Sequence, residues 1–332
     1  MNEITTVAID LAKNVFQLHG VDVRGGVVLR RQVKRAQLPA VLGRLPRCTI
    51  AMEACGGAHH WGRVCQALGH EVRLISPQFV KPFVKGNKTD RNDAEAICVA
   101  ALQPRMRFVA LKNVEQQQIL ALHRLRSHAV KGRTGLANQL RGLMLEFGIA
   151  VPQGIHRLKR ALPDILHSDD QRLPPIVRNE LRQQRDRLIA FDEEVRRLTD
   201  QIEQLVHADA RCEALMQRRG VGPLIASAFV AQVSDPQTFK NGRQVSAWLG
   251  LVPRQHSSGG KPQLLGISKR GDAYLRTLLI HGARSVVRTA HRHQDALSQW
   301  AQHVQARRGV HKATVAVANK MVRQLWAQLA YG

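Results

Sequence analysis

The sequence predicts an α/β N-terminal domain followed by a mostly helical remainder. Short apolar runs alternate with amphipathic stretches over residues 1–104, which indicates strands and helices of one sheet-containing domain. Apolar residues then recur at helical spacing over 115–147 and in a strict seven-residue repeat from 181 onward. At 332 residues with 44% hydrophobic side chains, the chain is long enough for two or three domains with real cores.

The chain carries far more positive charge than solubility requires. Its 50 Lys and Arg residues against 25 Asp and Glu give a net charge of +25, which indicates a polyanionic partner. Divided at residues 104 and 206, the net charges are +6, +6 and +13, so we expect the C-terminal part to hold the polyanion most tightly. Aromatic residues make up only 4%, which disfavours binding of single strands mainly by base stacking.

The sequence also indicates a location and a class of metal ligand. It has no long apolar run, and its first residues lack the layout of a secretory signal, so we expect a soluble, cytoplasmic protein that contacts no membrane. The 5 cysteines never form a C-x-x-C pair, and their odd number argues against a disulfide framework or a zinc ribbon. If a metal is bound, we expect oxygen ligands.

The first 104 residues predict the element order βββαβαβα, which a mixed sheet flanked by helices can satisfy. The first three strands form a meander, and Arg24-Gly25-Gly26 favours a hairpin-type turn between the second and the third. The predicted strands are 4–9, 15–21, 27–33, 48–52 and 71–75, and the predicted helices are 37–45, about 59–68 and a further one after the last strand.

The middle part, 105–206, predicts long helices around a Pro-rich linker at 151–175 that has room for one short helix. Beyond the linker, apolar residues recur every seven positions and favour a coiled coil, although an ordinary amphipathic helix presents the same stripe. Its partner is either 115–147 of the same chain or another subunit. The stripe consists of Leu181, Leu188, Val195 and Ile202, with Phe191, Leu198 and Leu205 as companions and Gln184 as the polar exception.

Residues 207–332 predict a separate, mostly helical domain with longer helices at 273–292 and 312–330. Gly220-Val221-Gly222 interrupts two helical stretches near its start. This string is similar to a helix-hairpin-helix turn, whose exposed amides bind a DNA phosphate through Gly220 and Gly222. A plain turn between helices has the same signature.

Four acidic residues occupy positions that suggest a metal site. Asp10 and Glu53 each end an apolar strand, and parallel neighbouring strands would place both carboxylates at one edge of the sheet. Asp90 and Asp93 lie three residues apart at a helix start, so they share one face. Converging carboxylates repel one another unless cations lie between them, and hard oxygen ligands select Mg²⁺ or Mn²⁺. Such ions can activate the attacking oxygen and stabilise the leaving oxygen in phosphodiester cleavage.

Each carboxylate also has a simpler interpretation. An Asp after a strand is commonly a turn or N-cap residue, which applies to Asp10. Asp90 could cap its helix while Asp93 faces solvent. Glu53 is harder to explain in this way, because the glycines Gly56 and Gly57 that follow allow close approach of a backbone or a phosphate.

Three strings surround the four carboxylates: Val7-Ala8-Ile9-Asp10-Leu11-Ala12-Lys13, Met52-Glu53-Ala54-Cys55-Gly56-Gly57 and Lys88-Thr89-Asp90-Arg91-Asn92-Asp93-Ala94. Each string is short, and the three are specific only jointly and in this order. With them the chain resembles the DEDD transposases of bacterial insertion sequences, which are relatives of the Piv-type DNA invertases, and the resemblance extends over essentially its full length. It implies a RuvC-like ribonuclease-H fold for residues 1–104 and a metal-binding tetrad of Asp10, Glu53, Asp90 and Asp93.

The resemblance also implies a nucleophilic serine in the C-terminal domain. As bare chemistry, the serines before Gly259-Gly260 are typical of a flexible loop, yet an activated serine can attack a phosphodiester. Members of the family carry this serine before a glycine and after a Gly-Leu-x-Pro-Arg string, which matches Ser258, with Ser257 as the adjacent competitor. The implied site is composite, because the carboxylate-bound metals and the serine meet there, often across subunits.

Basic residues after this string suggest a surface that binds nucleic-acid phosphates. Asp272 is expected to cap a helix on which arginines recur at multiples of four, although a solvated basic face has the same pattern. The chain has 15 histidines, and no pair of them has a second ligand pair at metal-ligand spacing. His59 and His60 are expected to cap or line the helix after Glu53, near the bound nucleic-acid phosphate. The candidate basic residues are Arg254, Lys261, Lys269, Arg270, Arg276, Arg284 and Arg288, with Arg292 as the last of the series.

The sequence therefore predicts a DNA recombinase that excises and inserts a mobile element. The resemblance implies double-stranded DNA as substrate, a structured guide RNA, a homo-oligomer (dimer or tetramer) and association with the bacterial nucleoid. The alternatives are a structure-selective nuclease of the Holliday-junction-resolvase type, which needs the carboxylates but no serine, and a non-catalytic basic nucleic-acid-binding protein.

Overall fold

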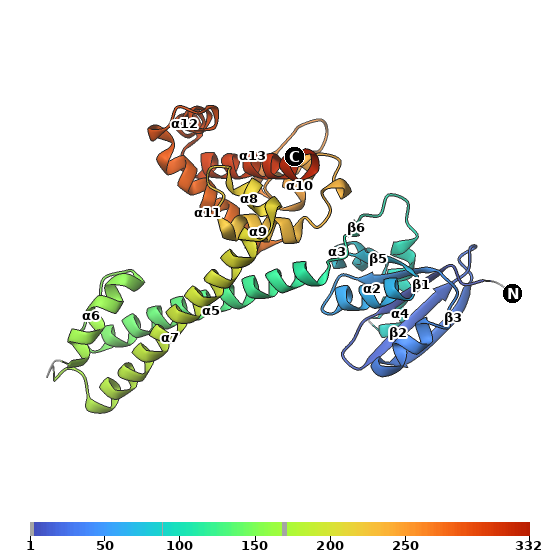
Figure 1. The fold of residues 1–332 in the computed structure, drawn as a ribbon, viewed down its shortest axis with the longest axis horizontal. Coiled ribbons are helices and arrows are strands. Elements are labelled where there is room, and N and C mark those ends of the chain that lie inside the picture. The colour runs from blue at the N-terminus through green and yellow to red at the C-terminus, as the bar shows by residue number, and fades with distance from the viewer. Residues whose placement is uncertain (1–2, 88, 168–170) are drawn as a thin grey trace. The chain divides into compact units, whose positions relative to one another are not determined.

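The structure is a computed structural model that describes residues 3–87, 89–167 and 171–332. The chain forms two compact units, Met1–Val114 and Glu115–Gly332, whose elements are drawn in Figure 1. The expected boundary at 206 lies inside the second unit. Of the expected linker, residues 168–170 lie outside the described residues, as does Lys88 of the third motif.

The first unit is built on a six-stranded mixed sheet with the strand order β3-β2-β1-β4-β5-β6. The first three strands are antiparallel neighbours, β1, β4 and β5 run parallel, and β6 pairs antiparallel with β5. This sheet is consistent with the expected ribonuclease-H-like fold. The strands are β1 Thr6–Asp10, β2 Val15–Val21, β3 Val27–Lys34, β4 Thr49–Glu53, β5 Glu71–Ile75 and β6 Phe108–Val109.

The sheet separates two hydrophobic cores. Along β1, Val7 and Ile9 belong to the core shared with α1 and α2, whereas Ala8 belongs to the core shared with α4. This alternation follows from the two-residue period of a strand buried on both faces. The helices of this unit are η1 Arg35–Gln37, α1 Leu38–Leu42, α2 Ala58–Ala67, α3 Pro77–Val80, η2 Lys81–Phe83 and α4 Asp90–Ala101.

The second unit begins with three helices, α5 Val114–Glu146, α6 Ile155–His167 and α7 Pro175–His207. The helix α6 is the short helix for which the linker was expected to have room. Helices α5 and α7 lie side by side, with α6 against them at one end (Figure 1). A Cβ added at Gly132 of α5 would lie 2.7 Å from the Phe191 ring of α7, so the glycine permits this close approach.

The heptad stripe of α7 finds its partner in the same chain. Leu181 and Leu188 are buried with Leu140 of α5 and Leu158 of α6 in one core. Asp192 beside the stripe pairs with Arg133 of α5 at 2.9 Å. The stripe is covered by these helices, and the expectation of a homo-oligomer therefore gains no support from it.

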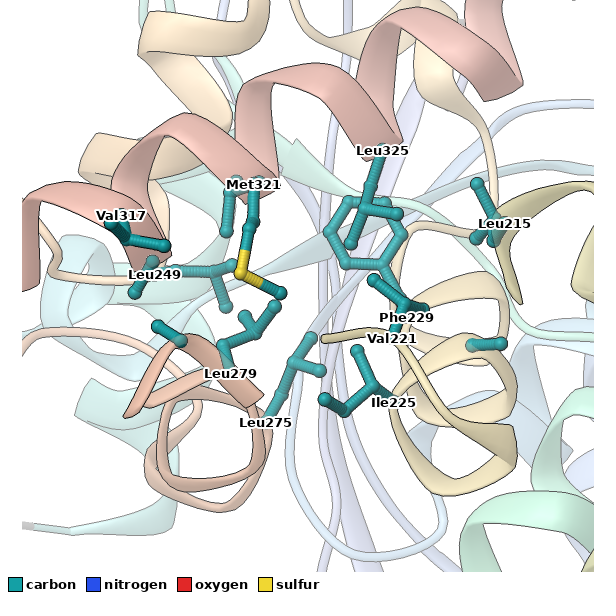
Figure 2. Packing of buried hydrophobic residues seen from close by; sticks show 14 of the residues in the cluster. Leu215, Val221, Ile225, Phe229, Leu249, Leu275, Leu279, Val317, Met321 and Leu325 are labelled. Carbon is teal, nitrogen blue, oxygen red and sulfur yellow. The ribbon is translucent and has the colours of Figure 1, made fainter. Parts of the chain in front are cut away.

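The remaining helices form a bundle around a large core (Figure 2). Phe229 from α9, Leu275 and Leu279 from α11, and Met321 and Leu325 from α13 meet there. Within the ranges that the structure describes, no helix is long and apolar enough to cross a membrane. The elements are α8 Ala210–Met216, α9 Pro223–Gln232, η3 Pro236–Thr238, α10 Gly242–Trp248, β7 Pro253–Gln255, β8 Leu264–Ile267, α11 Ala273–Thr289, η4 Ala290–Arg292, α12 Ala296–Arg308 and α13 Val310–Tyr331.

A buried polar network joins α5 to this bundle. His123 of α5 is only 1% exposed, and its Nδ1 and Nε2 lie 2.8 Å from the Tyr274 hydroxyl and 2.9 Å from Ser227 Oγ. Ser227 Oγ donates to the Pro223 carbonyl, so it accepts from Nε2–H, and Tyr274 donates to Nδ1. A neutral imidazole therefore satisfies every bond in the network.

Candidate functional site

The carboxylates of Asp10 and Glu53 emerge at the same edge of the sheet. Strands β1 and β4 are parallel neighbours with Ile9 opposite Met52, and Asp10 and Glu53 are the next residues of each strand. Both are half-buried. Burial raises the pKa of the nearby Cys55 thiol, and the negative charges of Glu53 and Asp10 raise it further. This edge thus places two acidic side chains and a thiol together.

Arg35 holds the loop that follows Asp10. Its Nε donates to the Lys13 carbonyl at 2.7 Å, and its guanidinium lies 5.1 Å from the Phe16 ring centroid and 5.5 Å from that of Trp61. Trp61 belongs to α2, which follows Glu53, so Arg35 connects the segments after both carboxylates. No local sequence pattern indicates this role, because the partners of Arg35 are distant along the chain.

Asp90 and Asp93 lie in the first turn of α4. The expectation that Asp90 could cap this helix is wrong, because Thr89 is the N-cap and its hydroxyl accepts from the Asn92 amide at 3.3 Å. The Asn92 side chain donates to the Asn87 carbonyl at 2.8 Å and also to that of Lys85. Asn92, which sequence reasoning missed, therefore fixes the loop before the two aspartates.

The four carboxylates do not form a complete metal-binding site in this arrangement. Among the described residues, no three His, Cys, Asp or Glu side chains are grouped so that they could hold a metal ion. The oxygen donors of Asp10 and Glu53 suit Mg²⁺ or Mn²⁺. Adding Asp90 and Asp93 as ligands requires a rearrangement of the side chains or of the first turn of α4.

His59 has a structural partner at the end of the unit. Its Nδ1 accepts from the Lys112 backbone amide at 3.2 Å, and Arg63 donates to the Lys112 carbonyl at 2.8 Å. His59 and Arg63 belong to α2, and Lys112 belongs to the segment after β6. This contact positions His59 against the segment after β6.

Ser258 lies at the tip of the β7–β8 hairpin. Gly259 and Gly260 have φ values of 56° and 74°, and the Lys261 amide donates to the Ser258 carbonyl at 3.1 Å. Two central residues with positive φ are typical of a type I′ turn, which explains the two glycines. The turn residues are exposed, so Ser258 is presented to solvent at the end of the hairpin.

The two adjacent serines differ in their hydrogen bonds. Ser257 Oγ accepts from the Gln255 side chain at 2.9 Å and from the Gln263 amide at 3.3 Å, and so braces the hairpin. Within the described part of the chain, the Ser258 hydroxyl has no such partner. The two serines therefore differ in that Ser257 Oγ accepts two hydrogen bonds within the hairpin, whereas Ser258 Oγ accepts none among the described residues.

Of the two glycines between α8 and α9, only Gly220 is required for helix packing. Gly220 has φ +79°, and a Cβ there would lie 2.6 Å from Val286 Cγ2 and 2.9 Å from the Gly282 carbonyl oxygen of α11. Gly222 is the N-cap of α9. The close approach to α11 explains Gly220 without a phosphate and supports the alternative of a plain turn between helices.

The candidate basic residues differ in exposure and in the contacts they make. Arg254, Lys261, Lys269 and Arg270 are exposed on and beside the hairpin, and Arg284 and Arg288 are exposed on α11. Arg276 is half-buried and already donates to the Leu249 and Arg270 carbonyls at 3.1 and 2.9 Å. Arg292 lies in η4 beyond the end of α11, so the expected row of four arginines on one helix is wrong. Asp272 caps α11 as expected and accepts from the Leu275 amide.

Comparison with known proteins finds matches in both the N-terminal and the C-terminal part of the chain. A family model described as "Transposase IS116/IS110/IS902 family" matches residues 212–299, and a DEDD transposase model described as "Transposase" matches residues 7–149. A probable family 20 transposase of Pseudomonas aeruginosa is 50% identical over 98% of this chain and 97% of that protein. The transposase for insertion sequence element IS1111A of Coxiella burnetii is 45% identical over 99% of this chain and 90% of that protein. The transposase for insertion sequence element IS1328 of Yersinia enterocolitica is 37% identical over 100% of this chain and 98% of that protein.

Proposed function

The chain belongs to the IS116/IS110/IS902 family of insertion-sequence transposases, and from this premise we propose that it cuts and rejoins DNA with a Mg²⁺-dependent carboxylate site and Ser258 as nucleophile. The observation that carries the proposal is the pairing of Asp10 and Glu53 at the parallel β1–β4 edge. The comparisons do not favour the alternative of a junction-resolving nuclease without serine chemistry.

In this proposal, the four carboxylates bind metal ions at the edge of the sheet. Asp10 and Glu53 supply the first oxygen ligands, and Asp90 and Asp93 complete the set when the first turn of α4 rearranges. Bound Mg²⁺ would supply charge stabilisation for phosphodiester exchange. The bonds from Arg35 and Asn92 limit how far the loops that flank these carboxylates can move.

Ser258 has the chemistry of a covalent nucleophile. Its Oγ attacks the phosphorus, an Oγ–P bond forms, one bridging P–O bond of the DNA breaks, and the leaving strand ends in a hydroxyl. The proton lost by the serine hydroxyl balances the proton gained by the leaving oxygen, and the phosphoserine link preserves the energy of the broken ester for rejoining. The unpartnered hydroxyl of Ser258 supports this assignment over Ser257, whose Oγ is engaged within the hairpin.

A structured guide RNA and a homo-oligomer complete the proposal. A net charge of +25 with few aromatic residues suits a protein that grips backbones while base pairing selects the sequence. Sequencing the RNA and DNA that copurify with the protein tests this part. Light scattering in the presence of both nucleic acids tests the oligomer, and a monomer there would count against it.

The chemistry is tested with three variants in a plasmid recombination assay and a denaturing gel for protein-linked DNA. We expect Asp10→Ala and Ser258→Ala to lower recombination by roughly a thousandfold or more. Ser257→Ala is the matched control, and we expect it to keep activity and form the adduct. Normal recombination by Ser258→Ala, or the absence of any adduct, refutes the serine mechanism. Full activity of Asp10→Ala refutes the metal site.

A further inference from the structure

The C-terminal bundle contains a basic groove outside the sites described above. It lies between α10 and α13, which pack against each other, and has a volume of about 480 Å³. Arg243 of α10 and Lys320 and Arg323 of α13 line it, together with the amide side chains of Asn241 and Gln324. The lining contains no acidic residue.

The charges of this groove are not neutralised within the protein. Across the ranges that the structure describes, neither Arg243, Lys320 nor Arg323 forms an ion pair. The Lys320 ammonium lies 4.4 Å from the Trp300 ring centroid, a contact that positions the charge without cancelling it. A groove on α7 contrasts with this one, because its cations Arg196 and Arg197 are accompanied by three carboxylates.

The packing of two helices fixes the spacing of the two arginines. A Cβ at Gly242 would lie 2.9 Å from the Arg323 Cα, so the glycine lets the start of α10 rest directly on α13. Arg243 is the next residue. The Asn241 side chain accepts from the Gln244 amide at 3.1 Å, which leaves its NH₂ group as a donor for another acceptor.

We propose that this groove binds the phosphodiester backbone of duplex DNA. The guanidinium groups of Arg243 and Arg323 supply donors to phosphate oxygens, and the lining contains no carboxylate that would repel a phosphate. Duplex DNA is the expected ligand, because the chain belongs to a family of DNA transposases. It rests on that membership and not on the proposed roles of Asp10 and Ser258.

The test compares two double variants of the full-length protein that remove the same charge. Arg243→Gln with Arg323→Gln alters the groove, and Arg196→Gln with Arg197→Gln alters the α7 surface. Equilibrium binding to a duplex of about 30 base pairs is measured against salt concentration. Loss of two phosphate contacts should lower the slope of log K against log salt by about 2, which corresponds to about 30-fold weaker binding near 0.15 M salt.

The outcomes separate the groove from general charge. An unchanged slope for the α7 control, with the expected fall for the groove variant, supports the proposal. Equal falls for the two variants, or no fall for either, overturn it. A fall that is seen with duplex RNA but not with DNA also overturns it. Binding requires neither Asp10 nor Ser258, so this result stands apart from that of the recombination assay.

Discussion

Acidification should destabilise the second unit through His123. Burial lowers the pKa of this histidine from 6.5 to about 4, because the charged imidazolium would lie within the junction of α5, α9 and α11. The unfolded chain therefore binds a proton at a higher pH than the folded chain does. The stabilisation is complete above pH 6.5, is lost as the pH falls toward 4, and changes no further below that.

The magnitude follows from the two pKa values. The interval between 6.5 and about 4, at about 1.4 kcal/mol per pH unit, corresponds to a maximum loss of about 3 kcal/mol. Between pH 8 and pH 4.5 the same relation gives about 2.5 kcal/mol. His123→Gln keeps a donor and an acceptor for the network but does not titrate, so the free energy of unfolding should lack this component.

Urea unfolding followed by tryptophan fluorescence measures the effect. Trp248, Trp300 and Trp326 belong to the second unit, so a Trp61→Phe background makes the signal specific to that unit. Wild type and His123→Gln are compared at the two pH values, with His281→Gln as the control because His281 is exposed on α11. Other titrating groups are common to all three proteins and cancel in the differences.

The reasoning is refuted if His123→Gln loses as much stability on acidification as the wild type does. It is also refuted if the His281→Gln control removes the same component. If His123→Gln is less stable by the same amount at both pH values, the glutamine packs or hydrogen-bonds less well than the histidine. The decisive quantity is the change in the free energy of unfolding between the two pH values.

Two further predictions concern residues that the structure assigns to packing. Gly220→Ala should lower the free energy of unfolding of the second unit by roughly 2 kcal/mol or more in urea, because Gly220 has a positive φ and the new Cβ would clash with Val286. Gly222→Ala is the control: Gly222 has a negative φ and open space around it, so no such loss is expected. Arg35→Met should lower the stability of the first unit by about 1–2 kcal/mol, since a hydrogen bond to the Lys13 carbonyl and the contacts to two rings are lost; an unchanged Trp61-based unfolding curve would contradict it.

Local patterns predicted most of the elements. The strands at 15–21 and 71–75 have the expected bounds, because alternating apolar residues fix a strand where one or both faces are buried. β6 was missed, since a strand of two residues carries no period. The helix α12 at Ala296–Arg308 was also missed, as only a few of its residues contact the core.

Fewer features of the candidate site than of the fold could be predicted from the sequence. That Asp10 and Glu53 follow apolar strands is visible in the sequence, and their pairing then requires only that β1 and β4 be neighbours. The distance of Asp90 from them depends on how α4 packs, which no local pattern encodes. The same holds for Arg276, whose spacing suggested a phosphate ligand and whose neighbours in space are carbonyl groups.

The paired helices α5 and α7 also have a mechanical consequence. Each contains 33 residues, and at about 1.5 Å per residue each extends about 50 Å. Ile202 and Val206 anchor one end of α7 in the bundle core, while α6 packs near the other end. A rotation of about 5° at the anchored end displaces α6 by roughly 4 Å, which is more than the length of a hydrogen bond. A small rotation of α7 in the bundle core would therefore change which groups α6 can contact.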